Sequence, residues 1–69
     1  MAKVTTRAAL TTVHGLLYNT KEMLTDAEGV ARDGGLSDVV ASVQYLNETV
    51  TDVLNDCRDR LAVMNGGRA

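Results

Sequence analysis

His14 and Cys57 are the two side chains best suited to nucleophilic or metal chemistry, because the sequence holds one histidine and one cysteine. A histidine can activate a cysteine as a nucleophile, and Asp56 would complete such a set. However, Cys57 occupies an inward position of a seven-residue apolar repeat, where a thiol is a small, inert hydrophobic group. The sequence has no phosphate loop and no two-cysteine zinc spacing. We therefore expect no enzyme activity, no cofactor and no metal, and at most an edge contact between His14 and Asp56.

A second set of residues suits recognition rather than catalysis. Tyr45 belongs to a line that repeats every seven residues and is otherwise acidic: Asp38, Tyr45, Asp52 and Asp59. Tyrosine is favoured at protein interfaces, because its ring buries well and its hydroxyl finds a polar partner. Tyr18, the other aromatic residue, also lies outside the apolar stripes. We expect these five residues to contact a partner protein; the alternatives are a solvated charged face and tyrosines that shield the margins of the core.

Length and composition limit the architecture that can position these residues. The chain has 69 residues, of which 45% are hydrophobic, and it contains no proline. A chain this short buries little surface by itself, and a single cysteine cannot close an internal disulfide. Stability must therefore come from regular helix packing, from a partner chain, or from both.

Apolar residues recur at helical spacing before the central glycines. They form three adjacent stripes: Leu10, Leu17, Leu24 and Ala31; Val13, Thr20 and Ala27; and Ala9, Leu16, Met23 and Val30. This wide apolar face predicts a helix over about residues 6–32, with Thr5 or Thr6 as its N-cap. Gly15 and Gly29 lie fourteen residues apart on one line of this helix. They either allow the backbone of a partner to approach closely or are positions where a loss of helix stability is tolerated.

The segment after the glycines has the same periodicity. One stripe holds Leu36, Val43, Val50, Cys57 and Met64, and a second holds Val39, Leu46, Val53 and Arg60, while Val40, Leu54 and Leu61 widen the apolar side. The residues 42–54 are rich in β-branched side chains, but strand propensity is mostly a packing preference, and the 3-4 repeat outweighs it. We predict a helix over about residues 37–63, capped by Ser37 or Asp38.

The sequence RDGGLSD joins the two segments and predicts a tight turn over residues 33–36. Gly34 is the expected left-handed residue that ends the first helix, and Gly35 permits the reversal. The whole chain is then one all-α domain, an antiparallel two-helix hairpin over residues 1–69 with a flexible tail over 65–69. Residues whose numbers add up to about 70 should face each other: Leu17 with Val53, Thr20 with Val50, Leu24 with Leu46, and Ala27 with Val43.

The hairpin has more apolar surface than one seam between two helices can use, since such a seam takes about two stripes from each helix. Surplus apolar surface of this kind is typical of an association face. We expect a homodimer that forms a four-helix bundle, and a heteromeric bundle is the alternative. The core or dimer face is expected to contain Leu10, Val13, Leu16, Leu17, Met23, Leu24, Val43, Leu46, Val50, Val53, Leu54 and Leu61.

The charge balance bears on partners and location. Seven basic and nine acidic residues give a net charge of −2, which does not favour general binding to nucleic acid. Arg7, Arg58, Arg60 and Lys3 should nevertheless gather at one end of the hairpin, with Arg68 in the tail, so a nucleic-acid-binding regulator stays a weaker alternative. No signal-peptide run and no apolar stretch of about 20 residues is visible, so we expect a soluble cytoplasmic protein without membrane contact.

These patterns together predict a small, non-enzymatic protein-binding module. The leading hypothesis is a homodimeric regulator, inhibitor or antiactivator that engages a larger protein. Phage-encoded takeover proteins share this form, but the analogy is one of form only. The alternative is a structural subunit of a hetero-oligomeric helical assembly.

Overall fold

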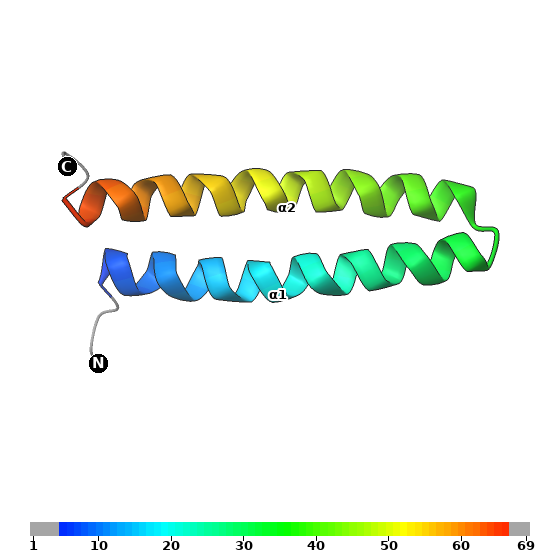
Figure 1. Ribbon diagram of the computed structural model, residues 1–69, viewed down its shortest axis with the longest axis horizontal. Helices are drawn as coiled ribbons and strands as arrows, with labels where there is room; N and C mark the ends of the chain where they lie inside the picture. The colour runs from blue at the N-terminus through cyan, green and yellow to red at the C-terminus, as the bar shows by residue number, and fades with distance from the viewer. Residues whose placement is uncertain (1–4, 67–69) are drawn as a thin grey trace.

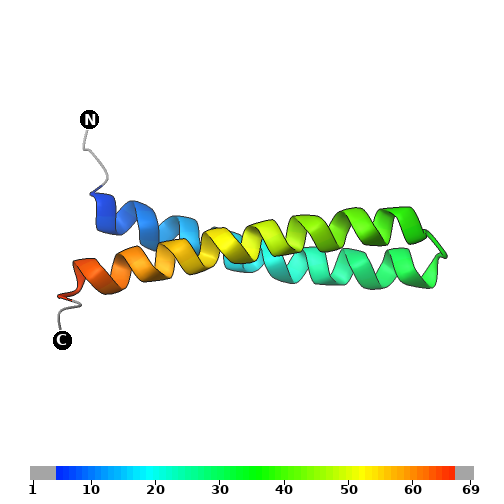
Figure 2. The ribbon, with the colours of Figure 1, turned by 90° about the horizontal axis from the view of Figure 1, so that it is seen from above.

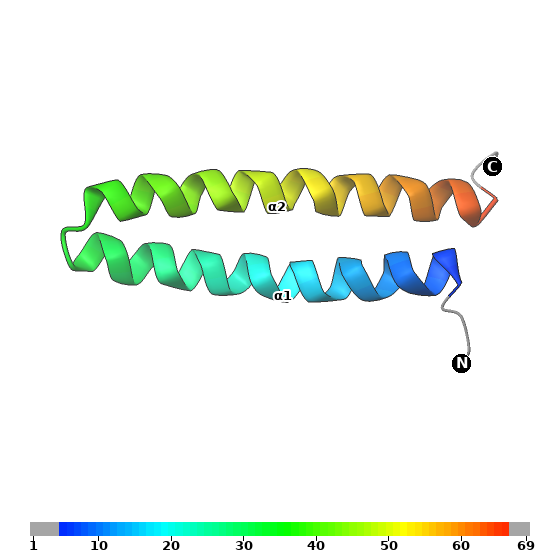
Figure 3. The same cartoon turned by 180° about the vertical axis from the view of Figure 1, so that it is seen from behind.

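The computed structural model describes residues 5–66 and consists of two helices joined by a short turn (Figure 1). Helix α1 spans Thr6–Asp33 and helix α2 spans Ser37–Met64. The helices run antiparallel and side by side along their whole length, and Figure 3 shows the same arrangement from behind. The predicted antiparallel helical hairpin is therefore confirmed. Each helix ends one residue later than the sequence predicted.

We call the end at which α1 begins and α2 stops the open end, and the other the turn end. Figure 2 shows that the two helices cross each other gradually between these ends. No helix within residues 5–66 has a stretch long and apolar enough to cross a membrane.

Local hydrogen bonds fix both ends of α1. The hydroxyl of Thr5 accepts a hydrogen bond from the backbone N–H of Ala8 at 3.1 Å, which confirms Thr5 as the N-cap. At the other end, the N–H of Leu36 donates to the carbonyl of Ala31 and the N–H of Gly35 donates to the carbonyl of Arg32. These two bonds form a Schellman motif, whose left-handed position follows the C-cap residue.

The left-handed residue of this motif is Gly35, with a φ of 73°, whereas Gly34 is the C-cap and has a right-handed φ of −84°. The prediction that Gly34 is left-handed was wrong by one residue, because α1 continues through Asp33. Gly66 is also left-handed, with a φ of 81°, and follows the end of α2 as a helix stop. The last three residues of the predicted tail, 67–69, lie outside the described residues.

Helix α2 begins without a side-chain cap. Leu36 is its N-cap and its carbonyl accepts the first helical bond, from the N–H of Val40. The prediction of a cap by Ser37 or Asp38 was wrong, because the short turn brings both residues into the first turn of the helix. Asp38 is still placed where its negative charge favours the positive end of the helix dipole.

One predicted stripe of each helix faces the other helix. The most buried residues are Ala31 on α1 and Val43, Leu54 and Cys57 on α2. Half-buried residues complete these rows, among them Leu10, Leu17 and Leu24 on α1 and Val50 and Leu61 on α2. Together these residues form the seam between the helices.

The second row of the seam differs from the prediction on both helices. On α1 it contains the polar residues His14, Lys21 and Glu28, and on α2 it contains Val40, Asn47, Leu54 and Leu61. The predicted second rows are turned outward: Val13, Val39 and Val53 are about two-fifths exposed and Leu46 is half exposed. On α2, the observed orientation places Val40, Leu54 and Leu61 in the seam, whereas the predicted orientation would have placed the row of Arg60 there. On α1 the long stems of Lys21 and Glu28 can lie along the seam while their charged ends reach polar groups.

The predicted register is confirmed by contacts between the helices. Side-chain hydrogen bonds join Arg7 to Met64, Lys21 to Asn47, Thr25 to Asn47, and Glu28 to Gln44. In each of these pairs the residue numbers add up to within two of 70. Thr20 and Val50 are both half-buried as expected, but Ala27, Leu46 and Val53 lie at the predicted height with their side chains exposed.

Candidate functional site

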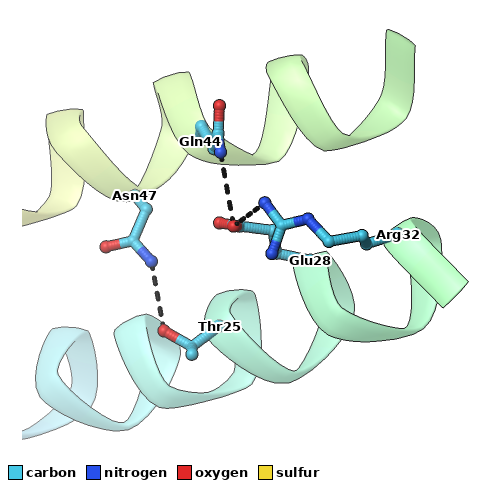
Figure 4. A network of polar contacts seen from close by, with 5 residues as sticks. All are labelled: Thr25, Glu28, Arg32, Gln44 and Asn47. Carbon is cyan, nitrogen blue, oxygen red and sulfur yellow. Dashed lines mark hydrogen bonds and ion pairs between the residues drawn. The ribbon is translucent and has the colours of Figure 1, made fainter. Parts of the chain in front are cut away.

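A network of polar side chains runs along one side of the seam (Figure 4). The ammonium of Lys21 donates to Asn47 Oδ1 at 3.1 Å, and Asn47 Nδ2 donates to the hydroxyl of Thr25 at 3.2 Å. Nearer the turn, Glu28 Oε2 accepts from Gln44 Nε2 at 3.3 Å and from Arg32 Nη2 at 2.8 Å. The network therefore joins the two helices by hydrogen bonds along this side of the seam. A fully apolar seam would have joined them by the burial of apolar side chains.

We call this side of the hairpin the polar face. It contains a shallow groove of about 440 Å³, lined by Lys21, Glu28, Gln44, Asn47, Glu48, Thr51 and Asp52. Three of these residues are carboxylates and one is an ammonium, so the groove is acidic. Carboxylates and amides arranged in this way can accept hydrogen bonds from a guanidinium or ammonium group. Within residues 5–66, no group of three or more histidine, cysteine or acidic residues is placed to hold a metal ion.

The two tyrosines are both exposed, one on each helix. Tyr45 is 72% exposed on the outer side of α2. Asp52, seven residues further on, belongs to the same line and also lines the groove. Tyr18 is half exposed on α1, where it is one helical repeat from Thr25 and so shares the side of the network. Its ring stacks on His14, with 6.5 Å between the centroids and 12° between the planes.

Asp38 and Asp59 complete the acidic line along the outer side of α2, and both are exposed. The line therefore runs from the first turn of α2 almost to its last turn. Only its central part, around Tyr45 and Asp52, adjoins the groove. Four of the five residues expected to contact a partner thus lie on one line of α2, and the fifth, Tyr18, lies on α1.

His14 and Cys57, the pair considered for nucleophilic chemistry, lie on facing helices, and Cys57 is a free, buried cysteine. Cys57 is 4% exposed, in the middle of the seam. Asp56 pairs instead with Arg60, at 3.1 Å between Oδ2 and Nε. Among residues 5–66 no hydrogen bond or ion pair joins His14 to Asp56, so the edge contact considered from the sequence is not formed.

Two of the basic residues expected at the open end, Arg7 and Arg60, contact their own chain, whereas Arg58 is exposed and its side chain makes no hydrogen bond or ion pair within residues 5–66. The guanidinium of Arg7 donates to the backbone carbonyl of Met64 at 2.9 Å. Arg60 is held by Asp56, although both side chains are more than half exposed and such a pair contributes little to stability. Lys3 and Arg68, which were predicted to add to this basic end, lie outside the described residues.

The opposite side of the hairpin is the apolar face, which contains Val13, Leu16, Thr20, Met23, Ala27 and Val30 of α1 and Val39, Leu46 and Val53 of α2. Its valine, leucine and methionine side chains are between 40% and 73% exposed. On each helix, the residue that directly follows a seam residue points to one side of the hairpin, and the residue that directly precedes a seam residue points to the other side. Thr25 and Gln44 follow seam residues and belong to the polar network. Val13 and Val39 precede seam residues, so their rows lie on the side opposite the polar face.

The residues that line the groove were not singled out from the sequence. One available signal was Asn47, which interrupts the row of Val40, Leu54 and Leu61 at a spacing of seven. A single asparagine in an apolar heptad row commonly fixes the register of paired helices. Its hydrogen bonds to Lys21 and Thr25 agree with that role.

Comparisons of the chain with protein-family models, with curated proteins and with solved structures give no match.

Proposed function

We propose that this chain is a small protein-binding module without catalytic activity, which acts as a homodimer and engages a basic surface of a larger protein. The observation that carries the proposal is Tyr45, which is 72% exposed on the same line of α2 as Asp52, a residue that lines the acidic groove. A large aromatic side chain in water gains free energy when a partner covers it. Exposed tyrosines next to charged residues are common anchors of protein interfaces.

The chemistry of the polar face suggests what the partner presents. Glu48 and Asp52 lie between Tyr45 and the seam and line the groove, whereas Glu28 across the groove is already paired with Arg32. An arginine or lysine of the partner would meet carboxylates there while an apolar contact covers the tyrosine ring. A regulator, inhibitor or antiactivator that masks a basic surface would use its acidic face in this way, and phage-type takeover proteins are an analogy of form.

The test is the variant Tyr45→Ala, made in the full chain and expressed with a tag in its own host. Proteins that co-purify are identified by mass spectrometry. Asn19→Ala is the matched control, because Asn19 is exposed on α1 away from the polar face. We expect Tyr45→Ala to reduce capture of the partner at least tenfold, in line with about 2 kcal/mol for an interface anchor, whereas Asn19→Ala retains it.

Circular dichroism and sedimentation of the same variants complete this test. Helicity and mass should be unchanged in both. If Tyr45→Ala instead dissociates the assembly or unfolds the helices, Tyr45 is a structural residue and the proposal fails.

The exposed apolar face supports a second candidate, a structural subunit of a hetero-oligomeric helical assembly. Sedimentation of the purified chain distinguishes the two. A well-folded homodimer opposes the second candidate, and a chain that aggregates or stays unfolded supports it. A role in nucleic-acid binding has less support, because Arg7 and Arg60 contact groups of their own chain.

A further inference from the structure

We propose that a second copy of the chain covers the apolar face in one defined arrangement. The twofold axis runs along the length of the hairpin, so that α1 of each copy packs on α2 of the other and both turns lie at the same end. This inference rests on the proposed homodimer and adds its geometry.

The apolar face has the size that a stable dimer needs. From Val13 to Val30 the face spans 18 residues, and the 17 steps between its ends amount to about 25 Å at 1.5 Å per residue. It is two helices wide, or about 20 Å. Each copy would then bury on the order of 500 Å², and the pair about 1,000 Å², which is the lower bound for a specific interface.

The charges of the apolar face favour a second copy as its occupant. No charged residue belongs to the rows from Val13 to Val30 or from Val39 to Val53. Two copies can therefore meet without bringing like charges together. The first charges beyond these rows on α2 are Asp38 near the turn, and Asp56 and Arg60 at the open end, which pair with each other.

Hydroxyl groups on and beside the apolar face are already satisfied within their own helices. Thr20 donates to the carbonyl of Leu16 at 2.8 Å, Thr49 to that of Tyr45 at 3.1 Å, and Ser42 to that of Asp38 at 3.2 Å. A buried hydroxyl without a partner would oppose association by about 1–3 kcal/mol. Covering this face leaves none of these three donors without an acceptor.

Side-chain size varies across the face in a fixed order. On α1, the outer row is large, with Leu16, Met23 and Val30, and the inner row is smaller, with Val13, Thr20 and Ala27. On α2 the order is reversed: the inner row is large, with Val39, Leu46 and Val53, and the outer row is small at Ser42 and Thr49. Leu16, Met23 and Val30 are also the most exposed of the large apolar side chains on this face.

Two twofold arrangements can bring two such faces together. With the axis along the hairpin, α1 packs on α2 of the second copy, and each large row meets a small row. In this arrangement Leu46 lies at a height between Thr20 and Ala27, because residues whose numbers add up to about 70 share a height. With the axis across the hairpin, large rows meet large rows and small rows meet small rows, which leaves gaps between the copies. Close packing therefore favours the first arrangement.

The preferred arrangement also determines where the partner-binding surfaces lie. Because α2 of the two copies are on opposite edges of the bundle, the two Tyr45 surfaces face away from each other. The dimer would then bind two partner molecules independently. With the axis across the hairpin, both surfaces would share one edge.

Cysteine cross-linking tests the arrangement in a Cys57→Ala background. In one mixture, Ala27→Cys protein is combined with Val39→Cys protein. In the control mixture, Val13→Cys protein is combined with Val30→Cys protein. All four residues are exposed in the hairpin, and each variant is first checked by sedimentation and circular dichroism. A short bis-maleimide is then added, and links between unlike chains are identified by mass.

We expect the Ala27 and Val39 variants to be linked, because these positions are about 6 Å apart along the bundle in the proposed arrangement. The Val13 and Val30 variants should stay unlinked, because they are about 25 Å apart. The reverse pattern in a dimeric protein would overturn the arrangement and leave the homodimer intact. A dimer with neither link would show that another surface is used. A monomer at all concentrations would overturn the homodimer itself, whereas the Tyr45→Ala capture experiment tests partner binding separately.

Discussion

Truncation of Leu54 and of Leu46 should affect the hairpin very differently, although one pattern in the sequence assigns both to the core or dimer face. Leu54 is 7% exposed in the seam, and Leu46 is 50% exposed on the apolar face. Leu54→Ala removes three buried carbon groups, or roughly 2.5 kcal/mol at about 0.8 kcal/mol each. The gap that remains brings the loss of stability to about 3 kcal/mol.

Leu46→Ala removes the same groups from a position that water already reaches. Its cost within one hairpin is about half the transfer term, or roughly 1 kcal/mol, with no closed cavity. The two variants should therefore differ by about 2 kcal/mol, which is on the order of 30-fold in the folding equilibrium. In the proposed dimer, the loss for Leu46→Ala rises with protein concentration, because a second copy covers the exposed half of the side chain.

Urea-induced unfolding followed by circular dichroism at two widely separated protein concentrations measures these losses. A short hairpin has little stability in reserve, so Leu54→Val, with a smaller loss of about 1 kcal/mol, keeps the comparison measurable if Leu54→Ala unfolds. Equal losses for Leu54→Ala and Leu46→Ala at the lower concentration would refute the assignment of the seam. A Leu46→Ala loss that does not change with concentration would count against the dimer face.

Three further substitutions test local features of the hairpin in the same unfolding assay. Thr5→Ala removes the N-cap acceptor of the Ala8 N–H and should lower stability by about 1 kcal/mol; no change would mean that this end of α1 is frayed in solution. Gly15→Ala should raise stability by about 1 kcal/mol, because nothing lies within 4 Å of an added Cβ, and a loss would favour the close-approach alternative. Gly35→Ala should instead lower stability by about 1 kcal/mol, because its φ of 73° is costly for alanine; an unchanged value would show that the turn can relax.

The helices and their register could be predicted because they depend on features that are local or periodic. Thr5 and the paired glycines mark the ends of α1. The seven-residue spacings of Leu17 and Leu24 on α1 and of Val43 and Val50 on α2 survive any small rotation of the helices. The left-handed residue was predicted at Gly34 and is found at Gly35. This error of one position arises because α1 ends at Asp33, one residue later than predicted.

The rotation of each helix about its own axis could not be predicted in the same way. Both helices offer apolar rows on either side of the central stripe, so apolar counting alone does not choose between them. The choice depends on whether Lys21 and Glu28 can lie in the seam and still meet Asn47, Gln44 and Arg32. Such pairing between distant residues is a tertiary property, and the acidic groove was missed for the same reason.

The Schellman turn at residues 31–36 has a consequence for the order in which the hairpin assembles. Contacts near the turn, such as the hydrogen bond between Glu28 and Gln44, join residues 16 positions apart, whereas Arg7 and Met64 are separated by 57 positions. Loop-closure entropy therefore favours helix pairing that begins at the turn, and the remaining contacts between α1 and α2 then form in order toward the open end. Amide protons should exchange with solvent fastest at the beginning of α1 and the end of α2, and slowest beside Ala31 and Val43.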